Sequence, residues 1–209
     1  MAWLHPLWRR PDRRSEPLER LLDRGFVAID LETTSLDPRS AAVVAAAAIP
    51  IVGGEPAPGY VTLVNPGRPI PAESMAIHGV TDAMVERAPD IGQALPHVDR
   101  VCGDRPIVGH GVEFDMAILA RERRARRQPT PANPVLCTQR LAAALYPRWT
   151  DVGLDAVAAR LGILISARHT PEGDAVAAAR VLLALLPAAR ERGARTVADL
   201  QWLASTAKV

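Results

Sequence analysis

The sequence predicts one α/β domain, in which three strands of an antiparallel meander precede helices that alternate with short strands. Apolar runs of strand length, separated by turns rich in glycine and proline, fill the first third of the chain, and apolar residues at helical spacing fill the rest. No repeat or low-complexity linker divides the 209 residues, a length that suits one sizeable core. We therefore expect a domain over residues 25–209, preceded by an N-terminal arm over residues 1–24.

Composition excludes several classes of protein. Hydrophobic residues make up 48% and charged residues 23% of the chain, which excludes coiled-coil, collagen-like and wholly disordered proteins. The net charge of +2 arises in residues 1–24, so it does not by itself indicate a nucleic-acid partner. Two cysteines without metal-ligand spacing, no membrane-length apolar run and no signal-peptide pattern predict a cytoplasmic protein without membrane association.

The N-terminal arm and the first strands follow from local patterns. Trp3, Leu4, Leu7 and Trp8 form an apolar cluster that we expect to pack on the domain itself, with a partner or membrane surface as the alternative. Three apolar runs bounded by turn residues predict strands, at 26–30, 43–52 and 60–64.

Helical spacing and capping residues mark the later elements. Thr81 is a suitable N-cap for a helix over 82–87. Further helices are predicted at 91–102, 112–127, 138–146, 154–161, 173–186 and 197–204, with short strands at 106–109 and 135–136.

Acidic residues stand at the ends of several of these elements. Asp30 and Glu32 are two residues apart at the end of a buried strand, so their side chains should point to one side. An unpaired carboxylate at the half-buried Asp30 is costly, and a bound cation would offset that cost. Asp115 and Asp174 each begin a helix, where an isolated acid is usually a cap or a dipole partner.

Taken together, these acids carry a family resemblance. The segments FVAIDLETTSLD, IVGHGVEFDMAIL and HTPEGDAVAAARVLLAL, in this order, resemble the DEDDh family of 3′→5′ exonucleases, and most closely its type represented by the proofreading epsilon subunit of bacterial DNA polymerase III. Residues 63–85 and the segment VGLDAVAARLGI also resemble that family. The resemblance implies a ribonuclease H-like fold, a mixed five-stranded sheet flanked by helices. The matching catalytic positions are Asp30, Glu32, Asp115, His169 and Asp174.

The resemblance also implies a two-metal hydrolysis of phosphodiester bonds from the 3′ ends of single-stranded DNA, releasing nucleoside monophosphates. Two divalent cations, Mg²⁺ or Mn²⁺, suit such a set of carboxylates. Asp30 would bridge both metals, Glu32 and Asp174 would hold the metal on the nucleophile side, and Asp115 would act through metal-bound water. His169 would be the general base, a task that an ordinary imidazole pKa of about 6.5 suits at neutral pH.

Substrate contacts are implied by the same family pattern. Thr33, Leu36, His78 and Phe114 would hold the 3′-terminal nucleotide, with Leu36 and Phe114 against the bases; a core position is the alternative for Phe114. The five arginines within residues 121–127 are expected to form a solvated helix end, with a phosphate contact as the alternative.

Four positions depart from the family pattern. Ser35 and Gly111 replace a glycine and the asparagine of an HN turn, while Ala45 and Cys137 replace acidic residues. These departures question the turn geometry and the order of the metal site, so we expect an enzyme slower than a replicative proofreader.

Two alternatives therefore stay open. One is a 3′→5′ exonuclease that acts on RNA or oligoribonucleotides, and the other is a catalytically weak member that binds nucleic acid or a polymerase. A DNA polymerase or clamp is a conceivable partner, although amphipathic packing is the expected role of Gln201, Trp202 and Leu203 in the last helix.

Overall fold

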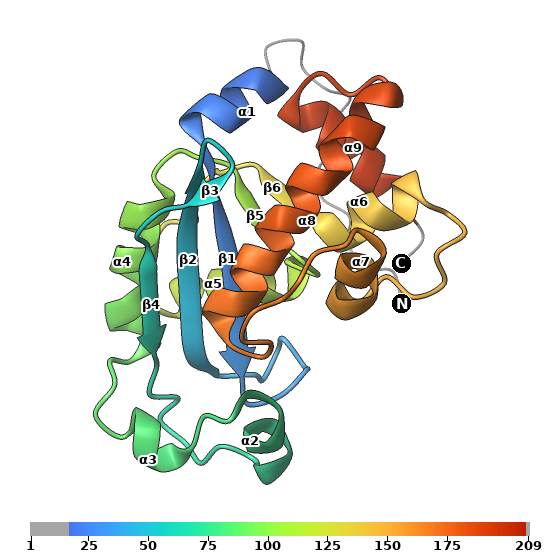
Figure 1. Cartoon of the computed structure of the whole chain (residues 1–209). Coiled ribbons are helices and arrows are strands. Elements are labelled where there is room, and N and C mark those ends of the chain that lie inside the picture. The colour runs from blue at the N-terminus through green and yellow to red at the C-terminus, as the bar shows by residue number, and fades with distance from the viewer. Residues whose placement is uncertain (1–16, 208–209) are drawn as a thin grey trace.

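The computed structural model describes residues 17–207, arranged as a central sheet between two layers of helices. Helix α8 (Pro171–Glu191) crosses one face of the sheet, and α4 (Ile91–Cys102) and α5 (Glu113–Ala125) cover the other (Figure 1). The predicted order, strands first and then helices alternating with short strands, is confirmed.

The sheet is mixed, as predicted. Strand β1 (Phe26–Thr33) pairs antiparallel with β2 (Val43–Val52) and parallel with β5 (Ile107–Gly109), which in turn pairs parallel with β6 (Val135–Cys137). Strand β4 (Tyr60–Leu63) completes the predicted meander on the far edge of β2. Within the described part of the chain the sheet has six strands rather than five, because the two-residue β3 (Glu55–Pro56) folds back on β2 after the Gly53–Gly54 turn.

The helices agree with the predicted ranges in most places. The shorter ones are α3 (Asp82–Val85), α6 (Thr138–Leu145), α7 (Leu154–Arg160) and α9 (Val197–Ser205). Thr81 occupies the N-cap position of α3, but its side chain forms no capping hydrogen bond, contrary to the prediction. Helix α2 (Ala72–His78) was not predicted from the sequence.

Helix α8 also continues beyond its predicted end at residue 186, through Pro187 to Glu191. Ala189, in this added turn, is fully buried in the main core cluster. Burial of this turn therefore outweighs the backbone hydrogen bond that proline cannot donate.

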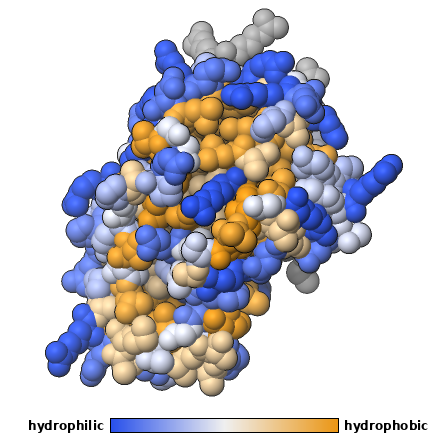
Figure 2. Space-filling view, viewed as in Figure 1, coloured by the Kyte–Doolittle hydropathy of each residue, from blue (hydrophilic) through white to orange (hydrophobic). Residues whose placement is uncertain are grey.

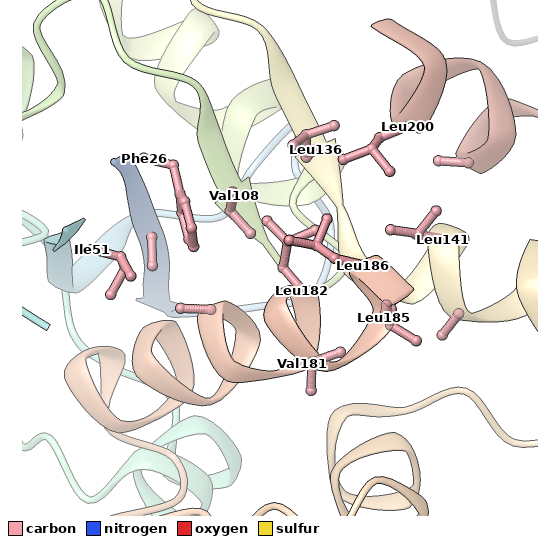
Figure 3. Close-up of a cluster of buried hydrophobic side chains, with 14 of the residues drawn as sticks. Phe26, Ile51, Val108, Leu136, Leu141, Val181, Leu182, Leu185, Leu186 and Leu200 are labelled. Atoms are coloured by element: carbon pink, nitrogen blue, oxygen red, sulfur yellow. The ribbon is translucent and has the colours of Figure 1, made fainter. Parts of the chain in front are cut away.

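The alternation of side chains along β1 decides where the site lies. Phe26 and Ala28 point toward α8 and join the main core cluster, together with Leu182, Leu185 and residues of α6 and α9 (Figure 3). Ile29 belongs to a separate cluster with residues of α4 on the other face. Because side chains alternate with a period of two, the residues at 30 and 32 continue the α8 face at the point where the apolar core ends.

Part of the predicted N-terminal arm is folded onto the domain. Residues 18–24 form α1 (Leu18–Arg24), whose Leu18 and Leu21 are buried in the main core cluster. Arg24 forms an ion pair with Asp104 at 2.6 Å. The tryptophans of the arm, at positions 3 and 8, lie outside the described residues. Among the described helices, none is both long and apolar enough to cross a membrane.

Helix α9 packs against the same core, as predicted. Gln201 donates a hydrogen bond from Nε2 to the Val135 carbonyl oxygen at 3.1 Å, and Leu203 packs on the main cluster. Trp202 between them is 49% exposed.

Candidate active site

Three carboxylates converge where β1 leaves the core and α8 begins. Asp30 and Glu32 extend from one face of β1, and Asp174 extends from the first turn of α8. One oxygen from each of the three lies within 4.8 Å of the others. Residues 142 positions apart along the chain thus form a single cluster of oxygen donors.

Asp115 lies beside this cluster, in the first turn of α5, with its side chain buried. Its Oδ1 accepts a hydrogen bond from the backbone N–H of Leu31 at 3.0 Å. Leu31 stands between Asp30 and Glu32, beyond the residues of β1 that pair with β5. Asp115 therefore holds the segment of β1 that carries the two acids.

The cluster carries more negative charge than its surroundings neutralise. Burial, followed by repulsion from Asp115, Asp174 and Glu32, raises the pKa of Asp30 well above its ordinary value. Burial is also the main reason that the pKa of Glu32 rises to about 7 and that of Asp115 to about 8, and that the pKa of Asp174 is raised. A bound cation would stabilise the ionised forms and so reverse these shifts.

The cluster fits divalent metal ions in both chemistry and geometry. Asp174 Oδ1 is buried and forms no hydrogen bond with any described residue, so it is an oxygen donor without a partner. Mg²⁺ and Mn²⁺ prefer carboxylate oxygens and retain several water ligands, so three or four acids suffice.

His169 stands next to the cluster, one residue before Thr170, the N-cap of α8. Its side chain is exposed, and its backbone has a φ of 61°, in the left-handed region. Its Nδ1 lies 3.3 Å from Nη1 of Arg168, the same nitrogen that contacts Asp174, so the imidazole stands beside the acids. An exposed imidazole in this position can exchange a proton with a water molecule held over the acids.

A cavity of about 580 Å³ extends from the carboxylates toward α2. All four residues predicted to hold a nucleotide line this cavity: Thr33, Leu36, His78 and Phe114. Phe114 is partly buried at the edge of a core cluster, so the core position holds in part, and its contact with a base stays a prediction. Glu73, Ser74, Ile77 and His110 line the same cavity and were not predicted.

The mouth of the cavity is apolar and exposed. Leu36 is 87% and Ile77 55% exposed, although both line the cavity. Figure 2 shows the end of the molecule that carries α2 and α3 largely in the colours of apolar residues. Exposed aliphatic side chains at a cavity mouth suit the flat, apolar faces of nucleobases.

Comparison with known proteins agrees with this geometry. Residues 27–182 match the family model for exonucleases, RNase_T.

The chain belongs to this exonuclease family.

Individual relatives support the same conclusion. A DNA polymerase III subunit epsilon-like protein of Rhodobacter capsulatus is 43% identical over 185 residues, which are 86% of this chain but only 26% of that protein. The DNA polymerase III subunit epsilon of Aquifex aeolicus is 33% identical over 168 residues, covering 80% of this chain and 83% of the relative. The chain thus spans about a quarter of the first relative and most of the second.

The fold is shared with a solved exonuclease. Exonuclease X, in complex with 5′ overhanging duplex DNA, aligns with a TM-score of 0.69 at 24% identity, covering 86% of this chain and 99% of that one. The predicted ribonuclease H-like fold is confirmed by this structural match. The DEDDh resemblance and the enzyme class, a 3′→5′ exonuclease, are confirmed by the family model and the relatives.

The departures of this exonuclease from the family pattern have local explanations. Ser35 is not among the described residues with positive φ, so its turn does not require glycine. Ala45 lies directly opposite Glu32 on β2 and packs with Ile70 and Val80, in a small apolar cluster. An alanine here gives Glu32 no carboxylate at the paired position of β2.

In the HN-like turn, the hydrogen bonds of His110 stand in place of those that the missing asparagine would make. Gly111 has a φ of 72°, which glycine adopts without strain. The preceding His110 donates from Nε2 to the Val152 carbonyl oxygen at 2.8 Å, and its Nδ1 lies 2.9 Å from Thr138 Oγ1. Burial lowers the pKa of His110 to about 4, so the ring is neutral at pH 7 and connects three segments at the rim of the cavity.

Two of the five arginines within residues 121–127 are not solvated, contrary to the prediction, whereas Arg124, Arg126 and Arg127 are exposed as predicted. Arg121 donates from Nη1 to the Pro38 carbonyl oxygen at 2.6 Å and from Nη2 to that of Ala41. Arg123 is buried and forms an ion pair with Asp99. Both side chains therefore stabilise the fold, and Arg121 in particular fixes the segment that follows Leu36.

Two further contacts fix the loop after β1. Ser74 of α2 donates its hydroxyl to the Thr34 carbonyl oxygen at 2.9 Å, and Arg68 donates to Thr34 Oγ1 at 2.9 Å. No sequence signal marks Ser74 as a site residue, because its contribution depends on the helix that was not predicted.

Proposed function

We propose that this domain removes nucleotides one at a time from the 3′ end of single-stranded DNA and releases nucleoside monophosphates. The observation that carries this proposal is the carboxylate cluster at one end of a cavity that is large enough for a nucleotide and has an apolar mouth. The printed names of the polymerase III epsilon relatives favour DNA over RNA as the substrate.

Asp30, Glu32 and Asp174 would hold two Mg²⁺ or Mn²⁺ ions, and Asp115, which lines the same cavity, would act through metal-bound water. When bound, the ions neutralise charge on the scissile phosphate and acidify the attacking water. His169 would accept one proton from that water as its oxygen bonds to phosphorus. The bond from phosphorus to the 3′ oxygen of the penultimate nucleotide breaks, and that oxygen takes up a proton as the shortened strand leaves.

The substrate contacts follow from the hydrogen bonds of the cavity. The Val80 N–H donates to Nδ1 of His78 at 3.0 Å, so the ring proton resides on Nε2. This Nε2 is buried and makes no hydrogen bond of normal geometry with the described residues, although the Thr33 backbone lies close enough to act on the ring. We infer that it donates to an oxygen of the terminal sugar or phosphate, while Leu36 and Phe114 contact base faces and Thr33 lines the wall.

The test is release of mononucleotides from a single-stranded DNA oligomer labelled at its 5′ end. We expect a ladder of shortened products that requires Mg²⁺ or Mn²⁺, disappears with a chelator and does not form from an end blocked by a 3′ phosphate. Asp30→Asn and Asp174→Asn should abolish hydrolysis while the protein stays folded. Products from the 5′ end, or equal activity in Asp30→Asn, would overturn the proposal.

A ribose oligomer of matched sequence separates the two substrate classes. Faster cleavage of RNA than of DNA would replace the DNA assignment by the oligoribonucleotide alternative. Binding of either strand without metal-dependent cleavage would instead support the catalytically weak alternative.

We also propose a cytoplasmic location and association with a DNA polymerase, on the strength of the relatives' names. Gln201 and Leu203 are engaged within the domain, so they do not favour a clamp-binding peptide in α9. Co-purification of a polymerase subunit with the tagged protein would support the association, and recovery of the tagged protein alone would contradict it.

A further inference from the structure

An arginine side chain lies on the metal-binding carboxylates. Arg168 precedes His169 in the loop between α7 and α8, and its Nη1 donates to Oδ2 of Asp174. Its Nε donates to Oδ1 of Asp155, on α7, at 2.9 Å. The guanidinium therefore bridges an acid of the proposed metal site and an exposed acid outside it.

The charge of Arg168 acts on the whole cluster. Besides its contact with Asp174, it partly offsets the rise that burial causes in the pKa of both Asp30 and Glu32. Asp174 has its second oxygen buried and unpaired, so the guanidinium is the cationic partner that the structure gives this carboxylate. A divalent ion on the same three acids would meet this positive charge at short range, and the two cations would repel each other.

The backbone on both sides of Arg168 is strained. Ala167 and His169 have φ values of 57° and 61°, in a region that non-glycine residues seldom adopt. The loop also lies close against the first turn of α8, where a Cβ on Gly173 would stand 2.2 Å from the Ala167 carbonyl oxygen. Strain of this kind persists only where other contacts hold it, and the Arg168 ion pairs are such contacts.

We propose that Arg168 is a built-in counter-cation that competes with divalent metal ions for Asp174 and thereby sets the metal concentration at which the enzyme is loaded. The inference rests on the proposed metal site. On metal binding, the guanidinium leaves Asp174 and is retained by Asp155. Because His169 is the next residue, this exchange also repositions the proposed general base, so metal loading and the placement of the base are coupled.

A purely structural role makes a different prediction. If Arg168 only stabilised the loop, its removal would loosen Asp174 and weaken metal binding or leave it unchanged. If Arg168 competes with the metal, its removal should strengthen metal binding although a hydrogen bond to a ligand is lost.

The experiment is calorimetric titration of the full chain with Mn²⁺, without nucleic acid. A pH of about 8.5 lies above the pKa of about 7 of Glu32, so protons compete little with Mn²⁺ for this carboxylate. We expect Arg168→Gln to bind Mn²⁺ about 10-fold more tightly than the unmodified protein does. Arg168→Lys keeps the charge but cannot contact Asp174 and Asp155 at once, so its Mn²⁺ affinity should lie between those two values. Arg160→Gln is the matched control: it removes the same charge from an arginine that stacks on Trp149 at 5.2 Å and donates to the Asp151 carbonyl, away from the cluster.

Thermal unfolding in a chelator supplies a second readout. Arg168→Gln should lower the melting temperature of the metal-free protein and increase the rise that Mn²⁺ produces. Unchanged or weaker Mn²⁺ binding by Arg168→Gln, or an equal gain in Arg160→Gln, would overturn the competition. Asp174→Asn distinguishes this result from a failure of the metal site itself. If the unmodified protein binds no Mn²⁺, or binds it no more tightly than Asp174→Asn does, the proposed metal site is wrong. The proposed competition is then wrong as well.

Discussion

Asp115 and Asp174 both begin helices, yet they use their carboxylates differently. One oxygen of Asp115 accepts a hydrogen bond from the Leu31 backbone N–H. In Asp174, one oxygen accepts a hydrogen bond from Arg168 and the other has no partner. The sequence places both acids at similar positions, and only the hydrogen bonds distinguish Asp115, which supports the strand, from Asp174, which has an oxygen free to bind a cation. The motif predicts which acids come together, while the part that each would play in the site depends on its hydrogen bonds.

His169→Ala tests the proposed general base. We expect a fall in kcat of about 10²–10⁴-fold, the usual effect of losing such a group, with Mn²⁺ affinity retained because His169 is not among the clustered ligands. Single-turnover cleavage and calorimetry measure the two quantities separately. His97→Ala is the control, since His97 is exposed and stacks on Tyr60, outside the cavity. A full cleavage rate in His169→Ala would withdraw the role.

Arg121→Gln tests whether this arginine positions a loop or binds phosphate. Because Arg121 holds the carbonyl groups of Pro38 and Ala41, we expect its loss to raise KM several-fold by loosening the loop that carries Leu36. The dependence of DNA binding on salt should not change, since no phosphate contact is lost. The exposed Arg124 serves as the control in Arg124→Gln. A smaller salt slope in Arg121→Gln alone would show a phosphate contact instead.

At the scale of elements, the first turn of α8 depends on a close backbone approach. A Cβ at Gly173 would lie 2.2 and 2.4 Å from the carbonyl oxygens of Ala167 and Ser166, and neither backbone atom can rotate away. We expect Gly173→Ala to destabilise the protein by about 2 kcal/mol and to lower kcat by displacing His169 and Asp174. Denaturant unfolding and cleavage assays measure both effects.

Glu172→Ala is the matched control for this change, because Glu172 is exposed in the same helical turn. Its stability and activity should stay close to those of the unmodified protein. Equal stability of Gly173→Ala and the unmodified protein would show that the loop can shift without loss, and would remove the argument that it is tightly held.

The elements differ in how far sequence predicts them. β1 and the helix at 91–102 are predicted because their apolar periods are clear and local. Helix α2 was not predicted, since it is short and has only one buried residue, the polar Ser74. The end of α8 beyond Pro187 was missed for the opposite reason: tertiary burial of Ala189 overrides the local signal of proline. The motif predicted that the acids come together, whereas the contacts of Arg168 and Arg121 follow from no motif and are seen only in the structure.

At the scale of the whole molecule, the proposed metal site would make folding and metal binding depend on each other. Burial raises the pKa of Glu32 to about 7 and that of Asp115 to about 8 in the folded protein, so the fold holds protons that the unfolded chain has already released at neutral pH. Their contribution to stability is fully present at a pH below about 4, the pKa range of unfolded carboxylates, and is lost as the pH rises through about 7 and 8. The metal-free protein should therefore become less stable between about pH 5.5 and 8.5.

Divalent metal ions should reverse this trend, because they bind the ionised carboxylates of the fold and have no formed site in the unfolded chain. We expect the rise in melting temperature on adding Mn²⁺ to be several degrees larger at a pH of about 8.5 than at about 5.5, measured against a chelator at each pH. Glu32→Gln is the control, since it removes one of the raised carboxyl groups and should flatten the pH dependence of the metal-free protein. If the gain with Mn²⁺ were equal at both values of pH, the buried carboxylates could not be the groups that bind the metal, and the link between the charge of the cluster and its function would be broken.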